Sequence, residues 1–478
     1  MKNLPLSALL LCLGGLGLLA QDKPFDSAAI RGLAQDKGQE TRDSETVRYR
    51  ELGEIVDDVA READKACVKE SDKVLITWMI DNSSLLKSSR HGELFSDHIV
   101  RAFAKSKAGV HHAVMTFSEA PSLILKATND PRGAARAIEW LADQKPDDRL
   151  KNCLENIRQG TKYGSGFSGK KLLVVWTPEN GDNEDNVEAT LKFLKDTNTT
   201  LFPIASEAIY SDPYWESLMY GTGTLYYGDP AKYKKMKFQM KGPESAYIEF
   251  PYGWILQVSD PTYTVPSGFG YWALDRLATH SGGRYFMYSL DSSAQTFCQR
   301  WACVICSGQH KSCGASFDIT KLKMTAPSIE SREDARERLS KERLSVLVYA
   351  TWEKLFRGEY LRSSSSLRVS GGALSESKPQ AGGGFPFTFG NNWGQGKAAV
   401  KRSLAELDKI IADFREALEK LGPEADKRSL ATADALLVHL RLLRLNVNQL
   451  GYFCEEAEEH DRKKHEAGGF GGDSLDDN

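Results

Sequence analysis

Apolar and polar positions follow two rhythms along the chain. Continuous apolar runs, typical of strands buried on both faces, occupy residues 74–80, 110–117 and 172–176 (VLITWMI, VHHAVMTF and LLVVW). Shorter strands are expected at 123–125, 201–204 and 284–288, and amphipathic helical patterns lie at 46–68, 93–107, 133–143, 149–159, 185–196 and 271–280. Strands that alternate with helices predict an α/β domain over residues 70–295, with a doubly wound, mostly parallel sheet.

One segment interrupts this alternation. Residues 209–268 are rich in Tyr and Trp and are punctuated by Gly and Pro, which predicts an aromatic-rich insertion between the last two sheet strands. Its aromatic residues, among them Tyr214, Trp215, Tyr252 and Trp254, either form a stacking surface for a sugar or partner protein or build the small core of the insertion. The core is the commoner use of such residues, so the binding surface is held as an alternative.

Helical patterns return after residue 321. Residues 322–361 form a helical segment, and the Ser/Gly-rich stretch 362–396 predicts a flexible linker. Residues 397–454 predict a helical hairpin, whose first helix carries an apolar stripe at Val400, Leu404, Leu407, Ile411, Phe414, Leu418 and Leu421. This stripe must be buried against another surface, which could be the α/β domain or the same helix of another copy of the chain. The charged, Gly-rich residues 455–478 predict a disordered tail.

The first residues have the layout of a secretory signal. Lys2 precedes an apolar run from Leu4 to Ala20 that contains three glycines, and polar residues follow. We expect a signal peptide over 1–20, cleaved after Ala20, with an uncleaved anchor as the alternative. A polar leader and a helix then occupy 21–69. The mature chain, in which no further apolar run is long enough to span a membrane, is expected in the periplasm, the cell envelope or the extracellular space.

Seven of the eight cysteines follow the predicted signal. Export favours disulfides, and an odd number leaves at least one cysteine over. Four cysteines lie together in a Cys-rich segment, 296–321: Cys298, Cys303, Cys306 and Cys313. With His310 between them this spacing also suits a zinc site, but exposed thiols oxidise outside the cytoplasm, so structural disulfides are favoured and zinc is not expected.

Charge and motif content exclude several classes of function. The formal net charge of −3 gives no electrostatic reason to expect nucleic acid. The adjacent His111 and His112 have no partnered nucleophile, and Ser165 lies in a Gly-rich loop without the strand and spacing of a nucleophile elbow. Since no nucleophile, base and orienting group can be assembled, we expect the protein not to be an enzyme.

Ligands bind open α/β sheets at the carboxyl ends of the strands. The first strand ends there in Asp81-Asn82-Ser83-Ser84-Leu85, and a later one gives LLVVWTPENGD. Together with ALDRLATHSGGRYF, these motifs resemble von Willebrand factor A (VWA) domains over about residues 70–290. KGPESAYIEF and VPSGFGYWALDRLA resemble a large-insert variety found in exported bacterial proteins. The resemblance implies a divalent cation held by Asp-x-Ser-x-Ser, a Thr and a Thr-Asp pair, with a partner's carboxylate completing the shell.

The first metal motif departs from the family pattern at one position. Asp81 and Ser83 match the motif, whereas Leu85 stands where a Ser is expected and cannot donate an oxygen. Asp81 and Ser83 also suit the start of the following helix, where their side chains would cap backbone N–H groups. The motif therefore predicts either a weakened metal site or a helix cap.

The other two loops depart as well. Thr177 matches the family, but Pro178 follows it where an Asp is expected, which leaves Glu179 or Asp182 as substitutes. The third loop offers Asp147 or Asp148 in place of a Thr. A degenerate site is therefore predicted, with Mg²⁺ or Ca²⁺ bound weakly or not at all, by candidates drawn from Asp81, Ser83, Asp148, Thr177, Glu179 and Asp182.

These observations predict an exported, non-enzymatic protein that binds a protein or cell-envelope ligand at the top of its sheet. The alternative is a structural component of an envelope assembly, in which the aromatic insertion or the helical hairpin makes the contacts. The sequence identifies neither the ligand nor the oligomeric state.

Overall fold

The computed structural model describes the chain in fifteen ranges, and the account below concerns these alone. They are residues 51–69, 71–82, 91–105, 109–119, 121–145, 152–177, 186–205, 207–209, 244–247, 266–288, 326–355, 367–370, 373–376, 393–421 and 426–468.

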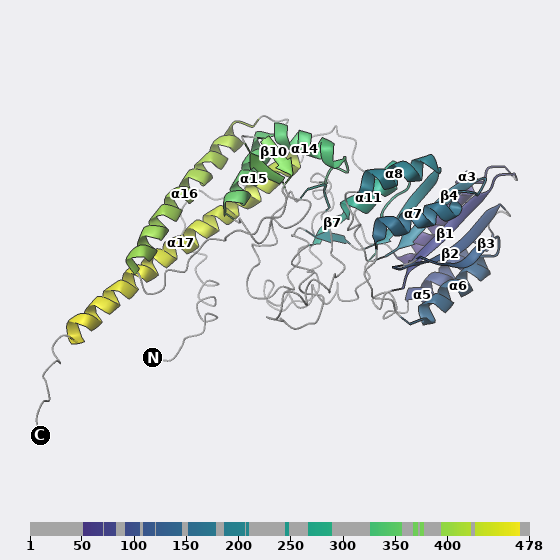
Figure 1. Cartoon of the computed structure of the whole chain (residues 1–478), viewed down its shortest axis with the longest axis horizontal. Helices are drawn as coiled ribbons and strands as arrows, with labels where there is room; N and C mark the ends of the chain where they lie inside the picture. The colour runs from purple at the N-terminus through teal and green to yellow at the C-terminus, as the bar shows by residue number, and fades with distance from the viewer. Residues whose placement is uncertain are drawn as a thin grey trace, which may run out of the picture. The chain divides into compact units, whose positions relative to one another are not determined.

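A six-stranded sheet is the centre of the α/β domain (Figure 1). Its strands are β1 (Val74–Asp81), β2 (Val110–Phe117), β3 (Leu123–Thr128), β4 (Lys170–Trp176), β5 (Thr199–Ala205) and β8 (Phe286–Met287), in the order β3-β2-β1-β4-β5-β8. All neighbouring pairs are parallel except β2 and β3, which are antiparallel at one edge. The predicted fold class, a doubly wound and mostly parallel α/β sheet, is confirmed.

Helices cover both faces of this sheet. One face carries α3 (Leu52–Ala66), α5 (His91–Ala102) and α6 (Pro131–Asp143), and the other carries α7 (Cys153–Gly164), α8 (Val187–Asp196) and α11 (Trp272–His280). All eight residues of β1 are buried, because this strand has a neighbour on each side and helices above and below. The continuous apolar run of its sequence reflects that position.

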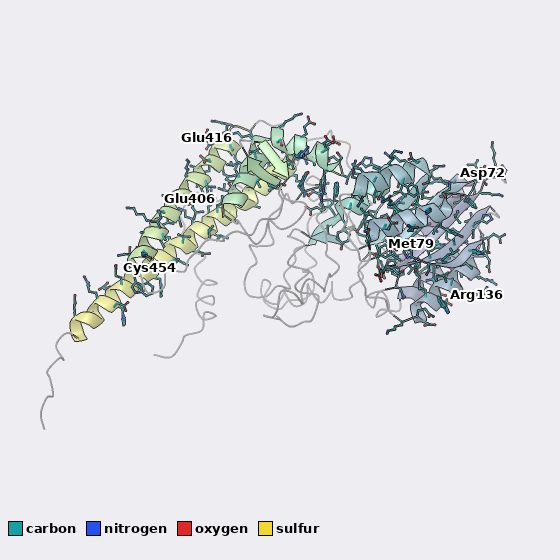
Figure 2. All side chains as sticks on the ribbon, viewed as in Figure 1. Asp72, Met79, Arg136, Glu406, Glu416 and Cys454 are labelled. Carbon is teal, nitrogen blue, oxygen red and sulfur yellow. The ribbon has the colours of Figure 1, made fainter. Side chains whose placement is uncertain are left out.

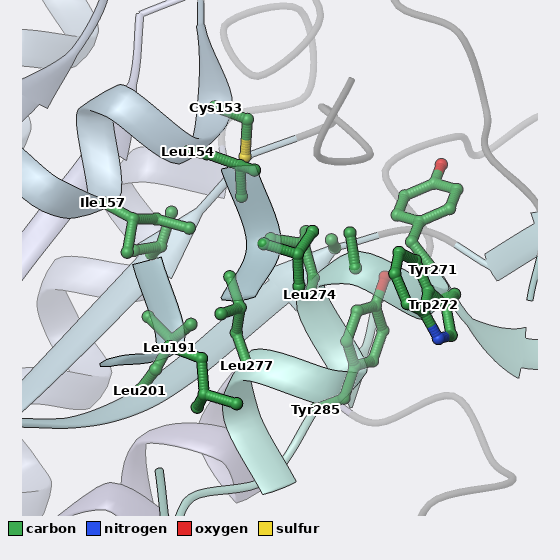
Figure 3. Packing of buried hydrophobic residues seen from close by; sticks show 14 of the residues in the cluster. Cys153, Leu154, Ile157, Leu191, Leu201, Tyr271, Trp272, Leu274, Leu277 and Tyr285 are labelled. Carbon is green, nitrogen blue, oxygen red and sulfur yellow. The ribbon is translucent and has the colours of Figure 1, made fainter. Parts of the chain in front are cut away.

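Two hydrophobic cores result from the alternation of side chains along the strands. Trp78 and Trp176 point to the first face, where they pack with Phe95 of α5. Met79 and Val175 point to the second, where they join side chains of α7, α8 and α11. Figure 3 shows part of this second core around Leu274 and Leu277 of α11.

The turn from α11 to β8 depends on two glycines. Gly282 has φ of +86°, a left-handed conformation that glycine adopts without steric cost. At Gly283 a Cβ atom would lie 1.9 Å from the carbonyl oxygen of Leu201, on the neighbouring strand β5. The Gly-Gly pair therefore lets the chain turn sharply and enter the sheet beside β5.

An antiparallel strand pair, β6 (Glu207–Ile209) with β7 (Pro266–Gly270), brackets the predicted insertion. Glu207 pairs with Gly270 and Ile209 with Pro266, so the two ends of the insertion lie together. Between them, residues 244–247 are buried, and Tyr247 belongs to the second core. The guanidinium carbon of Arg332 lies 5.9 Å from the Tyr247 ring centroid and 5.4 Å from that of Trp272.

Four helices follow: α14 (Arg332–Lys341), α15 (Arg343–Leu355), α16 (Trp393–Glu419) and α17 (Lys427–Gly468). The last two form the predicted hairpin. All seven residues of the predicted α16 stripe belong to a third core, shared with α15 and α17. The stripe therefore packs within this helical group, rather than against the α/β sheet or another copy as the sequence suggested.

Two predicted boundaries differ from the structure. The stretch 362–396, predicted as a flexible linker, contains an antiparallel pair, β9 (Leu367–Ser370) with β10 (Ala373–Glu376). The tail predicted from residue 455 continues α17 as far as Gly468. Its charges support the helix, because Lys463 and Glu459 form an ion pair at 2.7 Å and Arg462 and Glu466 one at 3.9 Å, each one helical turn apart.

Specific contacts join α14 and α17 to the α/β domain and its insertion. The Trp272 indole N–H donates to the Glu330 carbonyl at 3.1 Å, and Arg276 donates to the Ile329 carbonyl at 2.7 Å. Arg428, in the first turn of α17, forms a buried ion pair with Glu244 of the insertion. Within the described ranges, no helix combines the length and apolar character needed to cross a membrane.

Candidate functional site

Asp81 and Thr177 lie together at the carboxyl edge of the sheet. Asp81 is the last residue of β1, and Thr177 directly follows β4, the strand beside it. The Thr177 hydroxyl donates a hydrogen bond of 2.9 Å to Asp81 Oδ2, although the two residues are 96 positions apart in the sequence. Parallel register places both strand ends at the same edge, so the sheet itself creates this contact.

Both side chains are almost completely buried. Asp81 is 2% exposed and Thr177 is 0% exposed. A buried carboxylate needs hydrogen-bond donors or a cation, because it has lost most of its hydration. The Thr177 hydroxyl supplies one donor, and the Thr177 backbone N–H is itself bound to the Ile204 carbonyl at 3.1 Å, which fixes the residue against β5.

Asn82 connects this edge to the loop that precedes α7. Its Nδ2 donates to the Lys145 carbonyl at 3.3 Å, and its buried Oδ1 has no hydrogen-bond partner among the residues that the structure describes. Lys145 lies three positions before Asp148, the candidate ligand from the third loop. The contact therefore brings the start of that loop beside the end of β1, as the family pattern requires.

Ser118 and Asn156 form a second polar contact, at the carboxyl end of β2. The Ser118 N–H donates to Asn156 Oδ1 at 3.1 Å, and Asn156 Nδ2 donates to the Ser118 carbonyl at 2.9 Å. Asn156 lies in the first turns of α7, whose N-cap is Asn152. The sequence motifs do not mark Asn82, Ser118 or Asn156 as parts of this edge. Ser118 does carry a recognisable signal, because it is a polar residue directly after the buried strand β2, much as Asp81 is the polar residue at the end of β1.

The structure brings Asp81 and Thr177 together, and the other predicted metal candidates lie outside the described residues. These are Ser83, Asp148, Glu179 and Asp182. The alternative ligand-binding aromatics Tyr214, Trp215, Tyr252 and Trp254 and the cysteines Cys298, Cys303, Cys306 and Cys313 also lie outside them. Among the residues that the structure describes, no group of three His, Cys, Asp or Glu is placed to hold a metal ion.

The donor atoms at this edge are of the type that hard cations prefer. Asp81 offers a carboxylate and Thr177 a hydroxyl, and Mg²⁺ and Ca²⁺ bind oxygen ligands of these kinds. Two oxygens do not complete a coordination shell of six or more, so such an ion would need ligands from the adjoining loops. The described pair fits a hard cation in chemistry and supplies part of its shell.

The residues considered for catalysis have structural contacts. The Trp78 indole N–H donates to His112 Nδ1 at 3.2 Å in the first core. The Ser165 hydroxyl donates to the Lys162 carbonyl at 2.7 Å at the end of α7. Of the remaining cysteines, Cys67 and Cys153 are buried in the two cores of the α/β domain, and Cys454 is buried on α17.

The domain is VWA-like. A central β1 ends in Asp81, the adjacent fourth strand is followed by Thr177, and the two side chains meet at the carboxyl edge of a sheet covered by helices on both faces. This is the arrangement that the sequence motifs predict.

No protein-family model and no curated protein sequence matches the chain. Solved structures similar to it include the vWF domain of the type V pili tip protein Mfa5 from Porphyromonas gingivalis (15% identity, TM-score 0.19, 22% of this chain and 38% of that one). Another is the conserved hypothetical protein BatB from Bacteroides thetaiotaomicron (13% identity, TM-score 0.28, 49% of this chain and 99% of that one). A third is proximal thread matrix protein 1 from the mussel byssus, with a zinc-occupied MIDAS motif (18% identity, TM-score 0.24, 30% of this chain and 39% of that one). Similarities at this level concern the fold alone.

Proposed function

We propose that this protein is an exported, non-enzymatic binding protein whose VWA-like domain recognises a protein or cell-envelope ligand at the carboxyl edge of the sheet. The hydrogen bond between Thr177 and Asp81 carries the proposal. It assembles a polar pair from two adjacent strands at the edge where open α/β sheets bind their ligands. The pair offers carboxylate and hydroxyl oxygens of the kind that hard cations bind.

The proposed recognition includes a weakly bound Mg²⁺ or Ca²⁺ ion. Asp81 and Thr177 would contribute oxygens, together with ligands from Ser83, Asp148, Glu179 and Asp182 in the adjoining loops. Weak binding is expected because Leu85 and Pro178 replace two oxygen donors of the family pattern.

A structural role is the alternative, with the insertion or the helical hairpin making the contacts of a cell-envelope assembly. The buried ion pair between Glu244 and Arg428 favours this alternative, because it joins the insertion to the hairpin as one unit. The absence of enzymatic activity is part of both proposals. It is supported by the engagement of His112 with Trp78 and of Ser165 with the α7 terminus.

Thermal melting of residues 21–478 in chelator, and then with millimolar Mg²⁺, Mn²⁺ or Ca²⁺, tests the cation. An ion that binds only the folded state stabilises it by about 2.7 kcal/mol at one hundred times its Kd. We expect a small upward shift of Tm that Asp81→Ala abolishes. Asp97→Ala, which removes an exposed carboxylate of α5, is the matched control and should keep the shift.

Variants of Thr177 separate loss of the site from loss of the fold. Thr177→Ser keeps a hydroxyl beside Asp81, whereas Thr177→Val keeps the volume without it. Thr177→Val is expected to lower the free energy of unfolding by about 1–3 kcal/mol and to weaken the ion-induced shift, and Thr177→Ser should retain most of both. An ion-induced shift that persists in Asp81→Ala and Thr177→Val would place the ion elsewhere.

Binding of the full chain to isolated cell-envelope fractions distinguishes the two proposals. Loss of binding in Asp81→Ala, with binding retained in Asp97→Ala, is the result expected for recognition at the sheet edge. Equal binding by both variants would contradict that proposal and favour contacts through the insertion or hairpin.

A further inference from the structure

Large apolar side chains are exposed mainly along one helix. Of the seven exposed large hydrophobic residues in the described ranges, five lie on α17: Val438, Leu442, Leu445, Tyr452 and Phe453, with 45–62% of their surface accessible. Single exposed apolar residues are ordinary, but a contiguous row marks an interaction surface. Phe453 is packed edge-on against Trp393 of α16 at 5.9 Å between ring centroids, and the other four continue along α17 away from that contact.

Four of these five residues, all except Phe453, belong to a regular heptad seam. Spacings of four and three alternate through Ala431, Ala435, Val438, Leu442, Leu445, Gln449 and Tyr452, which we call the α17 seam. Sustained alternation of this kind over three heptads is the pattern of a coiled coil. A seam of 22 residues extends for about 33 Å at 1.5 Å per residue.

The seam lies opposite the face of α17 that packs against α15 and α16. Leu436, Leu440 and Val447 are buried in the third core with α15 and α16, and Cys454, labelled in Figure 2, is buried on the same side. Val447 follows Val438 by nine residues, or about 2.5 turns at 3.6 residues per turn, which places the two on opposite sides of the helix. The helix is therefore apolar on two faces, and the hairpin covers one of them.

We propose that the α17 seam binds the same seam of a second copy of this chain, in parallel and in register, as a two-stranded coiled coil with the α16 helices on its outer sides. A heptad seam accepts another heptad seam, and an identical helix supplies one of the same length and phase. The inference is independent of the proposed sheet-edge site, because it uses no residue of that site.

Gln449 determines the direction of the two helices. Ala435, Leu442 and Gln449 occupy one heptad position (a), and Ala431, Val438, Leu445 and Tyr452 the other (d). In a parallel pair each a residue faces its own counterpart, so Gln449 faces Gln449 of the second copy and the amides can donate to and accept from each other. In the two antiparallel pairings closest to the centre of the seam, Gln449 faces Ala431 or Val438, and neither offers a partner for a buried amide.

The flanking residues agree with this alignment. In a parallel pair, Arg441 on one side of the seam faces Asn446 of the other copy, and Asn448 faces Phe453. Neither pair brings like charges together. The single polar residue within the seam, Gln449, would fix the register at some expense of affinity.

Sedimentation or light scattering of residues 21–478 over a concentration series tests the proposal. The parent protein is expected to reach twice the single-chain mass, and Leu442→Glu/Leu445→Glu should reduce it to the single-chain mass. Both leucines are 50% exposed, so the double variant should keep the circular dichroism of the parent. Trp140→Glu is the control, because it also places a glutamate at an apolar residue, in α6, that is 51% exposed, and its mass should equal that of the parent.

Oxidative cross-linking tests the direction. Gln449→Cys is expected to give a covalent dimer under mild oxidation, whereas Lys401→Cys, at an exposed position of α16, should give no more than the parent. A parent that remains monomeric at all concentrations, or a double glutamate variant that is folded and still dimeric, would overturn the proposed interface. A dimer in which Gln449→Cys does not cross-link would overturn the parallel alignment.

Discussion

His112 is a titratable residue in the interior of the domain, where it accepts a hydrogen bond from the Trp78 indole. It is 1% exposed, and burial, with a smaller contribution from the adjacent His111, lowers its pKa from 6.5 to about 4. The imidazole is therefore neutral in the folded state at neutral pH, and its Nδ1 can act as the acceptor that Trp78 requires.

Acidification should destabilise the fold through His112. Between pH 6.5 and 4 the unfolded chain takes up a proton that the folded chain excludes, so stability that is fully present above pH 6.5 is lost as the pH falls. A pKa difference of this size corresponds to about 3 kcal/mol. Urea unfolding at pH 7, 5.5 and 4.5 measures the loss.

His112→Gln retains an acceptor for Trp78 and removes the titrating group, so it should reduce the pH dependence by that amount. His111→Gln, at the adjacent position on the other face of β2, is the control and should leave most of the pH dependence intact. An unchanged pH dependence in His112→Gln would assign the acid sensitivity to other residues.

Single residues differ in how far the sequence reveals them. The meeting of Asp81 and Thr177 is predictable, because each follows a recognisable parallel strand and the ends of such strands share an edge. The partners of Asn82 and Asn156 are not, because they depend on how loops of no fixed periodicity cross the sheet edge. Sequence motifs therefore identify contacts between residues at strand ends more readily than contacts that depend on the path of a loop.

Close approach of backbones controls the path of β8. Gly283 lies where the chain passes Leu201 of β5, and a side chain there would overlap the Leu201 carbonyl. Entry of β8 into the sheet thus depends on a position without a Cβ atom.

Gly283→Ala should lower the free energy of unfolding by about 1–3 kcal/mol, the usual cost of forcing extra volume into a packed site. Gly166→Ala is the matched control, because a Cβ atom at Gly166 would meet nothing within 4 Å, and its effect should stay within about 0.5 kcal/mol. Chemical denaturation of the two variants measures the difference. Equal effects of the two substitutions on the free energy of unfolding would mean that the backbone at residue 283 moves away from Leu201 without loss of stability.

Elements with strong periodicity are predicted well from the sequence, and elements held by pairing or charge are not. The buried runs of β1, β2 and β4 and the helices beside them are recognisable because each buries a whole face. The β9–β10 pair consists of two four-residue strands in Ser-rich sequence, too short for any period to be evident. The end of α17 is polar, so its ion pairs are visible only once the helix is assumed.

At the scale of the whole molecule, Glu244 and Arg428 join parts of the chain that the sequence treats as separate. Their side chains are 3% and 5% exposed, and 184 positions lie between them. Attraction between two charges at this depth offsets the loss of hydration of each, so removing one partner is costlier than removing both.

Arg428→Met should destabilise the protein by about 3–5 kcal/mol, because it leaves the Glu244 carboxylate buried without this guanidinium. Glu244→Gln in the same chain should restore much of the loss. Arg444→Met is the control, since its pair with Asp408 is largely exposed and contributes at most about 1 kcal/mol. Equilibrium unfolding of the parent, the two single variants Arg428→Met and Glu244→Gln, their double variant and the control gives these values, and additivity of the two single effects would show that the pair is not coupled.

No periodicity in the sequence indicates this contact. An amphipathic pattern identifies which face of a helix is buried, but not which distant segment covers it. The α16 stripe is an example: its apolar face is evident from the sequence, whereas the helices α15 and α17 that cover it are not.

The separation of Glu244 and Arg428 also affects how the protein is made. At 5–20 residues per second, a ribosome needs roughly 10–40 s to add Arg428 after Glu244. During that interval the nascent chain holds a glutamate whose native counterion does not yet exist, so the region around residues 244–247 cannot reach its final packing while the C-terminal helix is untranslated. Prematurely terminated chains would keep this defect permanently, which makes them natural targets for proteolytic clearance.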